Sequence, residues 1–244
     1  MRKQSDNQTG PRRGGEPVLS GAKARPRAKR REPSPLVAVV VVIFTVVEGE
    51  LRVLLIRRSA EPGKGLWAIP GGVLRPGETL VDAAVRKLVD ETGVRDLYLE
   101  QLYTFNDLDD ATPGGAIAVT YFALADHTRV RLAERTEWQP DWFAMRSLPK
   151  LAFRNELVLD YALERLRNKL EYTNVAYSLL PGRFTLSQLQ RVYESILGRK
   201  LDKRNFRKRM LSREIIAPTK ERQAEGAGRP ALLYRFASRE PVEM

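Results

Sequence analysis

Apolar residues along the chain alternate or cluster in a way that predicts short strands around a few helices. Residues 36–47 form an apolar run rich in Val and Ile, which is typical of a buried strand. Up to residue 170 we expect strands at 36–47, 51–57, 98–105, 115–125 and 142–144, and helices at 80–92 and 155–170. This mixed order predicts an α+β fold for residues 36–170.

The helix at 80–92 carries its own start and stop signals. Thr79 is a suitable N-cap, with Asp82 three positions later, and Gly93 can end the helix. Its buried side is expected at the apolar residues four apart, Leu80, Ala84 and Leu88.

The other side of this helix carries Lys87, Asp90 and Glu91, which are three and four positions apart. Three acids there would suit Mg²⁺, which is held by carboxylates together with substrate phosphates. Here an ammonium replaces one acid, and we expect it to reach and neutralise both remaining acids. The prediction is no metal site, or a weak one at Asp90 and Glu91.

Residues 171–240 have the pattern of a winged helix-turn-helix domain. We expect a short helix at 174–180, a second helix that Thr185 caps and Gly198 ends, and a third helix that begins after Asp202. Two strands follow, at 215–216 and 232–236.

The third of these helices is basic and resembles a major-groove recognition helix. Phe206, Met210 and Leu211 are expected to face inward. The predicted DNA-binding residues lie on the outer side and in a basic, Gly-rich wing at 220–230: Lys203, Arg204, Asn205, Arg207, Lys208, Lys220, Arg222 and Arg229. The alternative is an ordinary solvated face on a small helical domain.

The net charge of +12 is unevenly placed. Residues 1–35 hold ten lysines and arginines against three acids, and residues 151–244 hold nineteen against eleven, whereas residues 36–150 hold thirteen against sixteen. Basic flanks indicate binding to a polyanion. Residues 1–35 are poor in large apolar side chains, so we expect a disordered basic arm that either touches DNA phosphates or is an idle tail.

Composition excludes several kinds of site. The chain has no cysteine, so disulfides, thiolate metal sites and cysteine nucleophiles are excluded. Its single histidine, His127, is expected to be structural or exposed. The apolar run at 36–47 is too short to span a bilayer, and we expect a cytoplasmic protein.

Residues 72–94 carry the most specific motif. Gly72, Glu78, Arg86, Glu91 and Gly93 stand at the spacing of the Nudix box, and the segment 64–72 resembles the strand and loop that precede it. The resemblance implies an α/β/α sandwich. Lys87 stands where the family has a catalytic glutamate, and Asp90 is one methylene shorter than the usual glutamate. No catalytic residue is therefore expected, and Arg86, Asp90 and Glu91 are what remains of the catalytic set.

The Nudix resemblance also implies a pocket for a nucleoside diphosphate. Arginines suit phosphates, although Arg57 and Arg58 could equally be a solvated strand end. The expected effector-binding residues are Arg57, Arg58, Gly71, Gly72, Glu78 and Phe105.

A damaged Nudix box followed by a winged helix resembles the NrtR-type Nudix-related transcriptional regulators. The resemblance implies a homodimer that represses genes of NAD metabolism by binding double-stranded operator DNA, with ADP-ribose as the effector. No cofactor is required, and Mg²⁺ binding is expected to be weak. Two alternatives are an active Mg²⁺-dependent ADP-ribose pyrophosphatase with an accessory nucleic-acid-binding domain, and an architectural or RNA-binding protein that uses only its charge.

Overall fold

A computed structural model describes residues 35–95, 97–106, 108, 116–132, 137–224 and 230–243. Almost all of the predicted basic arm, and Arg229 of the predicted wing, lie outside the described residues. No helix within these ranges is long and apolar enough to cross a membrane.

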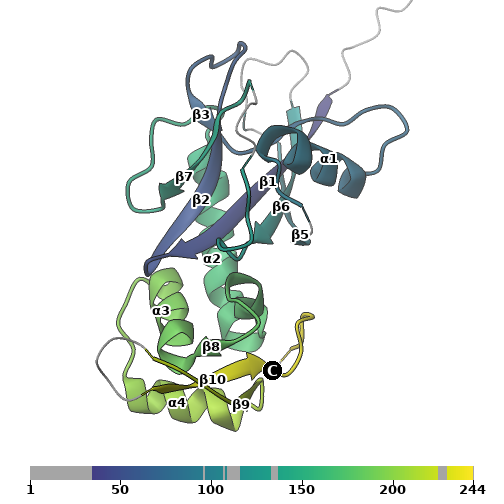
Figure 1. Ribbon diagram of the computed structural model, residues 1–244. Helices are drawn as coiled ribbons and strands as arrows, with labels where there is room; N and C mark the ends of the chain where they lie inside the picture. The colour runs from purple at the N-terminus through teal and green to yellow at the C-terminus, as the bar shows by residue number, and fades with distance from the viewer. Residues whose placement is uncertain are drawn as a thin grey trace, which may run out of the picture. The chain divides into compact units, whose positions relative to one another are not determined.

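The N-terminal half is built on a seven-stranded mixed sheet (Figure 1). Its main path runs β3-β2-β1-β6-β5, while β4 pairs with β1 and β7 pairs with β2. Strand β1 is parallel to β6 and antiparallel to β2 and β4. The strands are β1 (Leu36–Val47), β2 (Glu50–Arg57), β3 (Trp67–Ala68), β4 (Gly71–Val73), β5 (Tyr98–Phe105), β6 (Ala116–Leu124) and β7 (Pro140–Ala144).

A helix covers each face of the sheet, which confirms the predicted sandwich. Side chains of a strand alternate between the two faces. In β1, one set packs with α1 (Leu80–Thr92), and the other set packs with α2 (Asn155–Tyr172). The α1 side takes Val39, Val41 and Ile43, and the α2 side takes Val42, Phe44 and Val46.

The ends of α1 follow the predicted capping signals. The Thr79 hydroxyl oxygen accepts a hydrogen bond from the Asp82 backbone N–H at 3.1 Å. The Thr79 hydroxyl also donates to the Asp82 carboxylate at 2.6 Å. At the other end Gly93 has a φ of 76° and donates its N–H to the Val89 carbonyl. This left-handed conformation favours glycine and ends the helix.

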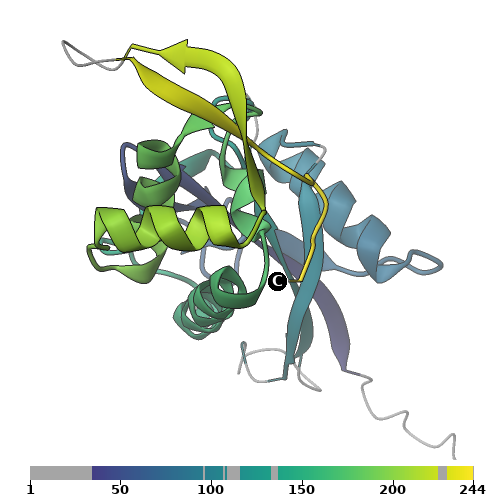
Figure 2. The same ribbon diagram turned by 90° about the horizontal axis from the view of Figure 1, so that it is seen from below.

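The C-terminal half is a winged helix. Its elements are η1 (Val175–Leu179), β8 (Phe184–Thr185), α3 (Leu186–Leu197), α4 (Lys203–Ser212), β9 (Ile216–Gln223) and β10 (Ala231–Phe236). The strands form one sheet in the order β8-β10-β9. In Figure 2 the yellow-green ribbon of β9 and β10 projects beyond the helices. Thr185 and Gln188 form a reciprocal capping box at the start of α3, as expected from Thr185.

Three details differ from the sequence-based expectation. The first short element is a 3-10 helix of five residues, shorter than the expected 174–180. Strand β9 continues to Gln223, so Lys220 and Arg222 lie in a strand and not in the loop of the wing. Leu211 is 38% exposed, because Phe206 and Met210, four residues apart, already fill the inward side of α4.

Candidate functional site

The segment that leads to α1 joins the edge of β1 through two glycines of β4, and Gly71 and Gly72 with the residues up to Thr79 are called the loop below. Strand β4 pairs Gly71 with Val40 and Gly72 with Val39. A Cβ at Gly71 would lie 2.6 Å from the Val39 carbonyl oxygen, so only glycine fits there. A Cβ at Gly72 would lie 2.6 Å from Lys87 Nζ, which shows that the lysine side chain runs across this glycine.

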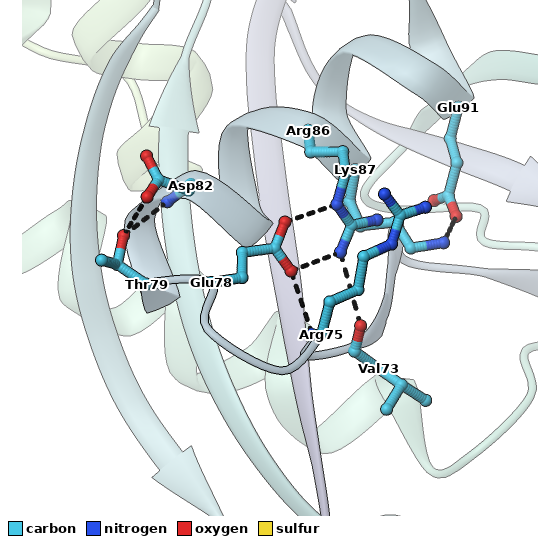
Figure 3. A network of polar contacts seen from close by, with 8 residues as sticks. All are labelled: Val73, Arg75, Glu78, Thr79, Asp82, Arg86, Lys87 and Glu91. Atoms are coloured by element: carbon cyan, nitrogen blue, oxygen red, sulfur yellow. Dashed lines mark hydrogen bonds and ion pairs between the residues drawn. The ribbon is translucent and has the colours of Figure 1, made fainter.

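Lys87 and Glu91 form an ion pair one turn apart on α1, in which Glu91 is buried and Lys87 is partly exposed (Figure 3). Lys87 Nζ lies 2.8 Å from Glu91 Oε1, and the Gly71 N–H donates to Glu91 Oε2 at 2.8 Å. The Glu91 side chain is only 1% exposed. Burial raises the pKa of Glu91, while the hydrogen bonds from Lys87 and Gly71 act to lower it. The ion pair with Lys87 therefore offsets part of the free-energy cost of burying the Glu91 side chain.

Glu78 and Arg86 form a second pair, also drawn in Figure 3. Arg86 Nε lies 2.5 Å from Glu78 Oε1, and Arg86 Nη2 lies 2.8 Å from Glu78 Oε2. The Arg75 N–H adds a third bond to this carboxylate at 3.0 Å. These contacts, above all the one from Arg86, lower the pKa of Glu78 to about 2. Arg86 also donates to the Val73 carbonyl at 3.4 Å, so the pair ties the loop to α1.

Mg²⁺ does not fit this arrangement of acids. The two carboxylates beside the loop are each bound to a cation of the protein, and Asp90 is exposed. The structure pairs Lys87 with Glu91, whereas the sequence suggests that it reaches both acids. Among the residues that the structure describes, no three His, Asp or Glu side chains are grouped so that they could hold a metal ion.

The two arginines predicted to bind the effector differ in their contacts. Arg58 donates to the Pro62 carbonyl at 2.7 Å, and its guanidinium lies 4.4 Å from the Phe153 ring. Its charge also acts to lower the pKa of Glu91. Arg57 is exposed at the end of β2.

Phe105 does not join the glycine loop. It lies in the same row of the sheet as Val73, with β6 and β1 between them. Its ring packs on Tyr103 at 5.1 Å and on Tyr161 of α2 at 5.8 Å. The structure therefore brings together Gly71, Gly72, Glu78, Arg86, Lys87 and Glu91.

Two residues near this centre were missed in the sequence. Arg75 is exposed, and its backbone and its charge both act on Glu78. The position of Arg75 between Gly72 and Glu78, inside the motif, could have indicated its role. The Trp138 ring lies 5.9 Å from Lys87 Nζ, and nothing in its sequence context pointed to the box.

The second candidate surface is the outer face of α4. All five residues predicted there are exposed, whereas Phe206 and Met210 on the opposite face are buried. Asp202 caps the helix by accepting the backbone N–H of Asn205 at 2.8 Å. The exposed residues are Lys203, Arg204, Asn205, Arg207 and Lys208. On the neighbouring strand β9, Lys220 and Arg222 are exposed too.

The basic surface also contains an ion pair and a cation–π contact that the sequence did not predict. Arg183 and Glu221 form an ion pair between the segment before β8 and β9. Arg209 lies 5.8 Å from the ring of buried Tyr193. Arg209 is exposed like its neighbours in α4, but it contacts α3 through this ring.

Comparison with known proteins covers both halves of the chain. Residues 35–163 match the NUDIX domain family, and residues 176–236 match the NrtR DNA-binding winged helix domain. A relative from Acinetobacter baylyi, the ADPR responsive transcriptional repressor NtrR, is 40% identical over 211 residues, which are 84% of this chain and 83% of the relative.

Two solved structures of Shewanella oneidensis NrtR are similar as well. The complex with a 27mer DNA has a TM-score of 0.72 and 33% identity, and the match covers 82% of this chain and 93% of that chain. The NUDIX domain complexed with ADP ribose has a TM-score of 0.50 and 31% identity, and the match covers 59% of this chain and 95% of that chain. With both domains matched in this order, the chain belongs to the family of NrtR-type Nudix-related transcriptional regulators.

Proposed function

We propose that this protein is a transcriptional repressor that binds operator DNA through α4 and is released by ADP-ribose. The observation that carries the proposal is the exposed basic face of α4, whose cations surround one amide side chain, Asn205. A helix in the major groove contacts phosphates with its cations and base edges with amide and guanidinium groups. The exposed Lys220 and Arg222 of β9 supply further phosphate contacts beside it.

The ligand is proposed from the loop and from the family. The cations around the loop suit a pyrophosphate, and the NUDIX domain of the Shewanella relative has been crystallised with ADP ribose. ADP-ribose is what remains of NAD when nicotinamide is removed. We therefore propose genes of NAD metabolism as the regulated genes, in line with the family resemblance.

We further propose that the Nudix domain hydrolyses ADP-ribose poorly. The family's catalytic glutamate is replaced by Lys87, whose ammonium is bound to Glu91. Loss of a general base commonly lowers a rate by about 10²–10⁴-fold. The regulator is proposed to act as a homodimer, because winged-helix dimers bind two half-sites about one helical turn apart.

A DNA-shift assay on the region upstream of the protein's own gene tests this function. The protein should retard this DNA and should not retard a fragment of equal length with scrambled sequence. ADP-ribose should restore the free DNA, whereas AMP at the same concentration should not. Equal retardation of both fragments would leave the charge-only alternative as the better account.

One observation favours a second function, an active ADP-ribose pyrophosphatase. Arg86 and Glu91 keep their places in the box, and Glu78 is bound to Arg86. Hydrolysis of ADP-ribose with Mg²⁺, at the rate of a competent Nudix enzyme assayed beside it, would support this alternative.

A further inference from the structure

Two of the three acids of the Nudix box, Glu78 and Glu91, are bound to the protein's own cations, and the third, Asp90, is exposed. Glu91 has one oxygen on Lys87 Nζ and the other on the Gly71 N–H, and it is almost completely buried. Glu78 has both oxygens on Arg86. Mg²⁺ requires a near-octahedral shell of oxygens and keeps several waters. To bind Mg²⁺, Glu78 and Glu91 would first have to break their ion pairs with Arg86 and Lys87, and the buried Glu91 would have to become accessible to water.

Lys87 is placed to act on a ligand of the loop as well as on Glu91. Its side chain runs across Gly72, where the loop lies against the sheet, and it is 20% exposed. An ammonium has three N–H donors, and Glu91 takes one. Arg75 in the same loop is exposed and adds a further positive charge. Lys87 and Arg86 balance the charges of Glu91 and Glu78, and exposed Asp90 balances that of Arg75. The charge of Arg58, which acts on Glu91, is the further positive charge at this centre.

We infer that Lys87 is a built-in cation that takes the place of a divalent metal, so that the pyrophosphate of a nucleoside diphosphate binds at this loop without Mg²⁺. The inference rests on the proposed function for the identity of the ligand, ADP-ribose. In a metal-dependent site the pyrophosphate is held by an ion that buffer conditions can remove. Here the positive charge is part of α1, and Glu91 holds it in place over the loop.

The first experiment measures metal binding by the full chain without any nucleotide. Mn²⁺, which stands in for Mg²⁺, is titrated into the protein and followed by electron paramagnetic resonance. Wild type should bind no Mn²⁺ at the box, whereas Lys87→Glu should gain a site. Mn²⁺ bound by wild type and lost in Glu91→Gln would overturn the inference.

The second experiment measures ligand binding by calorimetry, with EDTA and then with Mg²⁺. Wild type should bind ADP-ribose with the same affinity in both buffers. Lys87→Met should weaken binding by about 10- to 100-fold, because it removes a charged hydrogen-bond donor. Mg²⁺ should not restore the loss. Lys150→Met, which changes an exposed lysine that belongs to neither site, is the matched control and should bind as wild type does.

Lys87→Met leaves a buried carboxylate without its cation and could unfold the protein. The double variant Lys87→Met with Glu91→Gln removes both charges together and keeps the site neutral. It should be folded by circular dichroism and should show the same loss of affinity. A folded double variant that binds ADP-ribose like wild type would contradict a role for Lys87 in binding.

Inorganic pyrophosphate, titrated in parallel, separates this inference from the proposed effector. ADP-ribose binding that requires Mg²⁺ would overturn the inference and leave the effector in place. Pyrophosphate binding that depends on Lys87 in EDTA, without ADP-ribose binding, would support the inference and remove ADP-ribose as the effector. If neither ligand binds, both proposals fail.

Discussion

At the scale of single residues, the site is organised by acids that are paired before any ligand arrives. Glu78 joins the loop to α1 through Arg86, and Glu91 joins the same loop to α1 through the Gly71 N–H. Both acids thus position the loop relative to α1.

The Glu78–Arg86 pair predicts a specific response to acid. The folded pKa of Glu78, about 2, lies below its usual value of 4.5. At a pH above 4.5 the pair therefore makes its full contribution to the free energy of unfolding. This contribution is lost as the pH falls from 4.5 toward 2. Urea unfolding of wild type and Glu78→Gln from pH 7 to pH 2.5 should give two free energies of unfolding that converge at low pH. Curves that stay parallel over this range would show that Glu78 does not titrate as described.

The two loop glycines should differ in their tolerance of a methyl group. Gly71→Ala would push against the Val39 carbonyl, which is fixed in β1, and we expect a loss of about 1–3 kcal/mol in the free energy of unfolding. Gly72→Ala would push against the end of the Lys87 side chain, which can move. Its free energy of unfolding should fall by less, while ADP-ribose affinity should fall because Lys87 is displaced. Urea denaturation of both variants checks the order, and a larger loss of stability for Gly72→Ala would contradict it.

At the scale of elements, the proposed DNA contacts divide between the helix α4 and the strand β9. Asn205→Ala or Arg204→Ala in α4 should weaken binding to the operator by about 1–3 kcal/mol and relax the sequence preference, as expected for a lost base contact. Lys220→Ala or Arg222→Ala in β9 should weaken binding to all sequences alike, because phosphate contacts carry no sequence information.

Fluorescence anisotropy with operator and scrambled duplexes measures both effects. Lys150→Ala removes one exposed positive charge from the other half of the chain and serves as the control. If the α4 variants keep the full preference for the operator, α4 is not the recognition helix.

The elements that the sequence predicts well are those with local signals. The apolar run of β1 and the caps of α1 and α3 are set by neighbouring residues, so their bounds are close to those expected. Strands β3 and β4 have two and three residues and exist only because β2 and β1 pair with them. Such strands have no periodicity that a sequence could reveal.

The same distinction holds inside the site. Lys87 and Glu91 are four residues apart on one helix, so their contact follows from spacing. The bond from Gly71 to Glu91 joins residues twenty positions apart, and it depends on how the loop lies on the sheet. Leu211 was placed inward because of its type, but the inward face of α4 was already occupied by Phe206 and Met210.

At the scale of the whole molecule, the proposed release from DNA requires that ligand binding in one domain lowers the affinity of the other domain for the operator. A ligand shifts an equilibrium only if it binds one state more tightly than the other. ADP-ribose must therefore bind the DNA-free form more tightly than the DNA-bound form. By linkage, operator DNA then lowers the affinity for ADP-ribose by the same factor by which ADP-ribose lowers the affinity for operator DNA. Calorimetric titration of ADP-ribose into free protein and into the protein–operator complex measures this factor. Equal affinities would rule out ADP-ribose as the releasing effector.

A hydrogen bond between α3 and the turn after β1 offers a way to change only the factor by which operator and ADP-ribose lower each other's affinity. The Ser195 hydroxyl of α3 lies 2.7 Å from the Gly49 carbonyl oxygen, in the turn between β1 and β2, and 2.6 Å from the Arg191 carbonyl oxygen of its own helix, so its one proton is shared between these two acceptors. Ser195→Ala removes this bond and touches neither proposed binding surface. We expect the variant to bind operator alone and ADP-ribose alone with the affinities of wild type. When both ligands are present, each should lower the affinity for the other by a smaller factor than in wild type. An unchanged factor in the same pair of titrations would show that this bond carries no coupling.

Strand β1 reaches both places at once. Near its beginning it pairs with Gly71 and Gly72, and the turn at its end presents the Gly49 carbonyl to α3. Its twelve residues span about 40 Å, and neighbours on both sides hold it in the sheet. If ligand binding shifts the glycine end, that shift would reach Gly49 through one continuous strand, and with it the contact to Ser195 of α3.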